Sequence, residues 1–104
     1  MPLRRYIIER EIPKAGTLDA RQLKEAAVKS NEVLRQLGSD IQWVESYIAD
    51  DKLFCVYLAT SEDIIRKHAQ MSGFPATKII PIHRTIDPTT AQSSVGPVPI
   101  GHAL

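Results

Sequence analysis

The chain has 104 residues and a formal net charge of +1 at pH 7, with 43% hydrophobic and 6% aromatic residues. This length is enough for one domain with its own core, and a near-neutral charge with few aromatic residues argues against nucleic-acid binding. A single cysteine excludes an intrachain disulfide framework and is typical of a reducing compartment. The N-terminal residues do not form a secretory signal, and no apolar run reaches the roughly 18 residues that span a membrane, so we expect a cytoplasmic domain.

The first part of the chain predicts a strand followed by a helix. Residues 3–10 are rich in β-branched and aromatic side chains, and strand alternation puts Tyr6 and Ile8 on one face. Residues 18–37 carry apolar side chains at helical spacing. Asp19 and Gln22 predict a capping box at the start of this helix, and Gly38 predicts its end.

Residues 41–59 predict two strands joined by a tight polar turn, and this hairpin holds the single tryptophan and the single cysteine. Regular alternation predicts that one apolar face packs against the helices and consists of Val44, Ile48, Phe54, Val56 and Leu58. The opposite, open face would then carry Trp43, Glu45, Tyr47, Leu53, Cys55 and Tyr57. Such a face is too apolar to be left in water, so we expect it to form a dimer interface, a ligand pocket or a metal site.

The second half predicts a helix over residues 61–73, with His68 on its apolar stripe, and a last strand over residues 77–85, where Pro81 favours an edge position or a bulge. The order β-α-β-β-α-β predicts an α+β, ferredoxin-like fold for residues 1–86: a four-stranded antiparallel sheet with two helices on one face. Residues 87–104 are rich in Pro, Gly, Ser and Thr and predict an extended or disordered C-terminal tail.

Three side chains are candidate metal ligands: Cys55 as a soft sulfur donor, His68 as an imidazole, and Glu45 as a carboxylate between aromatic residues. Each also has a purely structural interpretation, as a buried hydrophobe, a core-edge histidine and an exposed charge. Regular alternation would place Cys55 and His68 on opposite sides of the sheet, whereas a bulge or a one-residue register shift would reverse this. We assign no catalytic residue, because the common nucleophile and phosphate-binding motifs are absent from the sequence.

The segments SNEVLRQLG (30–38), IQWVESYIADDKLFCVYLA (41–59) and IIRKHAQMSGFPATKI (64–79) resemble the small bacterial domain-of-unknown-function family numbered 4242. Some members of that family are described as nickel-binding or nickel-responsive. The resemblance covers roughly residues 3–88 and is most specific around Cys55 and His68. It implies a ferredoxin-like fold, usually as a dimer, and a metal such as nickel. Glu45 stands where related sequences often have histidine, and Pro81 departs from the ending of the family's last strand.

Two functional hypotheses follow. The first is a small cytoplasmic protein that binds a divalent transition metal such as nickel through Cys55, His68 and Glu45. The second is a dimeric α/β-barrel-type enzyme or small-molecule-binding module, with a pocket on the open sheet face that is lined by Trp43, Tyr47 and Tyr57. Both predict a homodimer or higher homo-oligomer with neither nucleic acid nor a membrane as partner. A purely structural domain without a small-molecule site remains a third interpretation.

Overall fold

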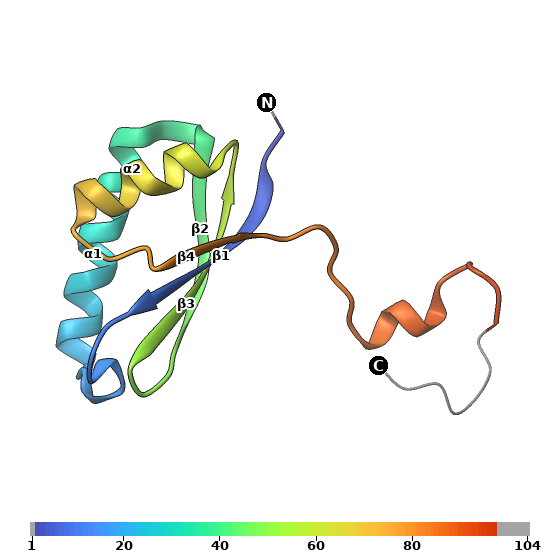
Figure 1. Ribbon diagram of the computed structural model, residues 1–104, viewed down its shortest axis with the longest axis horizontal. Helices are drawn as coiled ribbons and strands as arrows, with labels where there is room; N and C mark the ends of the chain where they lie inside the picture. The colour runs from blue at the N-terminus through green and yellow to red at the C-terminus, as the bar shows by residue number, and fades with distance from the viewer. Residues whose placement is uncertain (1, 98–104) are drawn as a thin grey trace.

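The computed structural model describes residues 2–97, and its strands form one antiparallel sheet that two helices cover on one side (Figure 1). The order of the main elements is β1 (Arg4–Glu11), α1 (Ala20–Leu37), β2 (Ile41–Ile48), β3 (Lys52–Ala59), α2 (Glu62–Ser72) and β4 (Lys78–Pro81). The strands lie in the order β2-β3-β1-β4 across the sheet. This is the predicted ferredoxin-like α+β fold. Among the described residues, no helix combines the length and the apolar character needed to cross a membrane.

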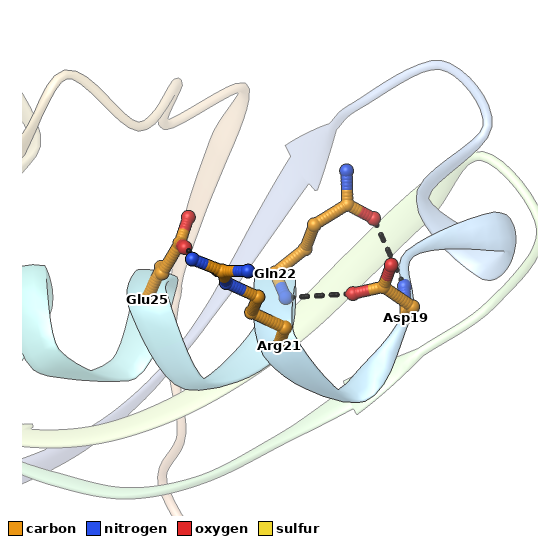
Figure 2. Close-up of polar contacts among 4 residues, drawn as sticks. All are labelled: Asp19, Arg21, Gln22 and Glu25. Carbon is orange, nitrogen blue, oxygen red and sulfur yellow. Dashed lines mark hydrogen bonds and ion pairs between the residues drawn. The ribbon is translucent and has the colours of Figure 1, made fainter.

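Helix α1 begins at the predicted capping box (Figure 2). The Asp19 carboxylate accepts a hydrogen bond from the Gln22 backbone N–H at 2.9 Å, and the Gln22 side-chain oxygen accepts one from the Asp19 N–H at 3.0 Å. Two of the N–H groups that a helix start leaves unpaired are therefore satisfied. The helix ends at Gly38, whose positive φ of 80° favours glycine.

The core lies between the helices and one face of the sheet, which we call the helix-side face. In β1 this face carries Tyr6, Ile8 and Arg10, all buried, because alternate residues of a strand point to the same side. The hydrophobic core that these strands share with helix α2 consists of Tyr6, Ile8, Ile41, Cys55, Tyr57, Ala59 and Ile65.

The prediction of which hairpin face meets the helices was wrong for β3 and for Trp43, whereas Ile48 lies on the helix side as predicted. Cys55 and Tyr57, which were predicted on the open face, are 3% and 2% exposed and belong to the core. Phe54, Val56 and Leu58 alternate with the core residues of β3 and therefore lie on the opposite side, which we call the outer face. The face of β3 with Phe54, Val56 and Leu58 was predicted as the apolar, helix-facing one, so hydrophobicity alone did not identify the helix side.

A β-bulge in β2 explains why the predicted open-face residues of this strand divide between the two faces. Trp43 pairs with Tyr57, whereas Glu45 pairs with Val56, so Val44 is an extra residue in the ladder. Trp43 therefore lies on the helix side, while Glu45 and Tyr47 lie on the outer face. Regular alternation had predicted all three on one face. The bulge exchanges the faces of every β2 residue that follows it.

Strand β4 is shorter than predicted and pairs only with β1, so Pro81 stands at the predicted edge position. After β4 the chain runs away from the helices (Figure 1). It forms a short 3-10 helix, η3 (Pro88–Gln92), and residues 83–97 are exposed throughout. The remaining part of the predicted tail, residues 98–104, lies outside the described residues.

Candidate functional site: a cavity between helix α1 and the sheet

A cavity of about 530 Å³ lies between helix α1 and the helix-side face of the sheet. Pockets of about 300–1,000 Å³ are the usual size for small-molecule sites. The α1 wall consists mainly of small and aliphatic side chains: Leu23, Ala26 and Ala27, with Ser30, Gln22 and the preceding Leu18. The small alanines keep this helix face from filling the space above the sheet.

The opposite wall comes from the three neighbouring strands β1, β2 and β3. Its residues are Arg10, Ile12, Trp43, Ser46, Ile48, Leu53, Cys55 and Tyr57, and the segment after α2 adds Phe74 and Pro75. The bulge in β2 brings Trp43 and Ser46 to the same side of the strand, and the indole Nε1–H donates a hydrogen bond to Ser46 Oγ at 2.9 Å. This bond fixes the indole ring at the wall of the cavity.

Arg10 is the charged residue of the cavity wall, and it is only 2% exposed. Its guanidinium donates hydrogen bonds to the carbonyl oxygens of Pro75 at 2.9 Å and Phe74 at 3.4 Å, and to Tyr57 Oη at 3.4 Å. The guanidinium carbon also lies 5.9 Å from the ring centroids of both Tyr57 and Phe74. These contacts hold the cation between two aromatic rings.

His68 lies behind this wall and is fully buried. Its Nε2 shares a hydrogen bond of 3.1 Å with Ser30 Oγ, its ring packs edge-on against Tyr57 at 5.4 Å, and its Nδ1 has no hydrogen-bond partner among the described residues. Burial, and secondly the positive charge of Arg10, lower the pKa of His68 from 6.5 to about 4. The imidazole is therefore neutral at physiological pH.

Burial also raises the pKa of the Tyr57 hydroxyl, although the neighbouring Arg10 charge acts in the opposite direction. Tyr57 is thus a neutral hydroxyl at physiological pH, and it can both donate and accept a hydrogen bond at the cavity wall. Cavity, guanidinium and hydroxyl together form a site suited to binding.

The predicted site residues divide between the two sides of the sheet. Trp43, Cys55 and Tyr57 line the cavity, and His68 packs against Tyr57. Cys55 and His68 therefore lie on the same side of the sheet, whereas regular alternation had predicted them on opposite sides. The predicted pocket therefore lies on the opposite side of the sheet from where we expected it.

Glu45 and Tyr47 are on the outer face and exposed, and the Tyr47 hydroxyl donates a hydrogen bond to the Glu45 carboxylate. This bond raises the pKa of Tyr47. The sheet separates Glu45 from Cys55 and His68. Within residues 2–97, no three or more His, Cys, Asp or Glu side chains form a group that could hold a metal ion.

Arg10 is the site residue that we did not predict from the sequence. The signal was present, because Arg10 continues the alternation of Tyr6 and Ile8 and so occupies an inward position of β1. An arginine at an inward strand position is rarely fully buried without a partner, which makes it informative. The predicted strand ended at this residue.

The described geometry can be compared with known proteins. A family model with the description "Nickel responsive protein SCO4226-like" matches residues 6–82, which include Arg10 and both walls of the cavity. Among solved structures, the chain is similar to the crystal structure of SCO4226 from Streptomyces coelicolor A3(2). The two are 12% identical with a TM-score of 0.67, over 79% of this chain and 99% of that one. At this identity the likeness shows the fold alone. No curated protein matches the chain.

Proposed function

We propose that this chain, which belongs to the family of nickel-responsive proteins described as SCO4226-like, is a small binding protein whose ligand occupies the cavity between α1 and the sheet. The cavity itself carries the proposal. Its size suits a small organic molecule, and its walls combine aliphatic and aromatic side chains with a few polar groups, as ligand pockets do. The single cysteine is consistent with a cytoplasmic location.

Filling the cavity tests this function directly. Ala27 faces the cavity, whereas the next residue, Val28, is 48% exposed. Ala27→Phe should therefore abolish binding, and Val28→Phe should leave it unchanged. The probes are three compounds with the same eight-carbon chain: octanoate, octanamide and octylammonium. Two residues of the cavity wall provide the readouts. These are the fluorescence of the only tryptophan, Trp43, and the alkylation rate of the only cysteine, Cys55.

At least one of the three probes should change Trp43 emission and slow the alkylation of Cys55, in the Val28→Phe variant but not in the Ala27→Phe variant. The cavity would be rejected as a binding site if no probe acted on either readout. Equal binding to both variants would reject it as well.

Nickel is a second candidate ligand, and the family description favours it. Cys55 and the unpartnered Nδ1 of buried His68 are suitable donor types on one side of the sheet. The described residues do not fit a complete site, because Glu45 lies on the other side and the Arg10 charge opposes a cation nearby. A nickel ion here would need further ligands, such as water.

Isothermal titration of tag-free protein with nickel tests this candidate. Binding by the wild type that is lost in both Cys55→Ser and His68→Gln would support it, with His83→Gln as a control at an exposed position. Nickel binding that survives both substitutions would exclude these two residues as the site. An absence of heat with the wild type would exclude nickel.

We also propose that the protein forms a homodimer through the outer face of the sheet. This face presents apolar side chains, among them Tyr47 and Ile80, which are 55% and 43% exposed. Around them lie charged side chains of both signs: Arg5, Lys52 and Lys78, and Glu9, Glu11 and Glu45. A second copy related by a two-fold axis could pair opposite charges around the apolar centre, so the same patch serves both partners.

A further inference from the structure

The guanidinium of Arg10 is a buried positive charge at the cavity wall without an opposite charge beside it. Its hydrogen bonds reach two carbonyl oxygens and one hydroxyl, all of them neutral. The ion pairs among the described residues are Arg21–Glu25, Lys52–Glu9 and Arg66–Glu62, and none includes Arg10. Neutral acceptors orient the guanidinium, but its unit charge stays uncompensated.

The other lining residues do not supply that charge. Arg10 is the one Arg, Lys, Asp or Glu among them. An arginine cannot avoid the cost of burial by losing its proton, as a lysine can, because the guanidinium stays protonated in proteins. A buried ion without a counter-ion is costly, and a ligand anion would offset part of this cost. The site is thus electrostatically incomplete by one negative charge.

The rest of the cavity indicates what carries that charge. Leu23, Ala27 and Leu53 provide an apolar surface, and the neutral polar groups are the hydroxyls of Ser30, Ser46 and Tyr57, the amide of Gln22 and the indole of Trp43, which already donates to Ser46. With a single cation, the site suits one negative charge better than the two charges of a phosphate monoester. The planar fork of a guanidinium also matches the two oxygens of a carboxylate.

We propose that the ligand of this cavity is a small amphiphilic carboxylic acid, whose carboxylate pairs with Arg10 and whose apolar body lies against helix α1. The proposal rests on the proposed function, since it needs the cavity to bind a ligand at all. Arg10 then acts as the residue that sets the charge specificity of the site.

The test compares head groups on one apolar chain. Octanoate, octanamide and octylammonium are titrated into the wild-type protein, with Trp43 emission and Cys55 alkylation as readouts. Octanoate should bind about tenfold or more tightly than octanamide, because only the carboxylate adds a charge opposite to that of Arg10. Octylammonium should bind most weakly. The preference for octanoate should disappear in Arg10→Met and persist in Arg66→Met, a surface arginine outside the cavity.

The wild-type comparison does not depend on whether Arg10→Met folds, so the proposal can be refuted without that variant. Equal binding of octanoate and octanamide, or a preference for octanamide or octylammonium, would overturn the acid specificity and leave the proposed binding function standing. An absence of binding by all three probes would overturn both. A tenfold preference for octanoate that persists in a folded Arg10→Met variant would show that another group binds the carboxylate. This result would overturn the assignment to Arg10.

Discussion

The buried imidazole of His68 couples the stability of this protein to pH. Its pKa in the folded state is about 4, against an ordinary value of 6.5. Above pH 6.5 the imidazole is neutral in both the folded and the unfolded state. Between pH 6.5 and 4 the unfolded chain binds a proton that the folded protein does not, so the free energy of unfolding falls as the pH falls. The full loss corresponds to about 3 kcal/mol.

Urea unfolding at about pH 7.5 and about pH 4 measures this effect. The wild type should lose about 3 kcal/mol more between the two pH values than His68→Gln does. The exposed His83 provides the control, since His83→Gln should keep the wild-type loss. If His68→Gln and the wild type lost equal stability, His68 would not be the group that titrates.

Individual residues also show what the sequence could reveal of the site. Trp43, Cys55 and Tyr57 were selected because rare side chains gathered on one hairpin, and all three line the cavity. The orientation of Arg10 could have been inferred from its alternation with Ile8. The absence of a negative charge beside Arg10 could not be inferred from the sequence, because it depends on which acidic residues lie nearby in three dimensions.

Among the secondary-structure elements, helix α1 was predicted correctly at its end and within two residues at its start, because both limits have strong local signals. The Asp19–Gln22 capping box and Gly38 mark its limits, and neither depends on the rest of the fold. Its inward face also forms one wall of the cavity, so the local signals of the sequence position part of the site.

Replacing Asp19 by alanine should lower the free energy of unfolding by about 1 kcal/mol, because the helix start then loses its cap. Arg21→Ala is the matched control two residues away. Its ion pair with Glu25 is 88% and 67% exposed, and such pairs contribute little. The pair and the cap lie side by side on the first turns of α1 (Figure 2). Chemical denaturation measures both variants, and equal losses would contradict the assignment of the cap.

Strand β2 shows why the faces of the hairpin were mispredicted. A bulge depends on how two strands pair, so it leaves little trace in the local sequence. Residues 41–43 and residues 45–48 each alternate as in a regular strand, but the extra residue Val44 lies between them. Trp43 and Tyr47 therefore point to opposite faces, although they are four residues apart. The type and position of this strand could be predicted from its composition, but its orientation required the pairing with β3.

At the scale of the whole molecule, the order of the elements was sufficient to predict the fold. Two strand–helix units with a hairpin between them form the ferredoxin-like sheet when β1 lies between β3 and β4. The location of the cavity could not be predicted in the same way. It depends on the small side chains of α1 and on which face of the hairpin they cover.

The outer face gives the prediction for assembly. Ile80→Glu should convert a dimer into a monomer in sedimentation experiments, because it places a charge in the apolar part of the proposed interface. Val28→Glu introduces the same charge at a similarly exposed position on α1, and this variant should remain a dimer. A monomeric wild-type protein, or an unchanged mass for Ile80→Glu, would contradict the proposed interface.

The hydrogen bond from Arg10 to Pro75 joins residues 65 positions apart in the chain. Closing a contact of this separation has a large entropic cost, so it forms late in folding unless it belongs to the nucleus. On the ribosome, the cavity therefore cannot be completed until most of the domain has been synthesised. If its contacts form after the transition state, a ligand that binds there should mainly slow unfolding and leave the folding rate almost unchanged. Occupancy of the cavity would then extend the lifetime of molecules that have already folded.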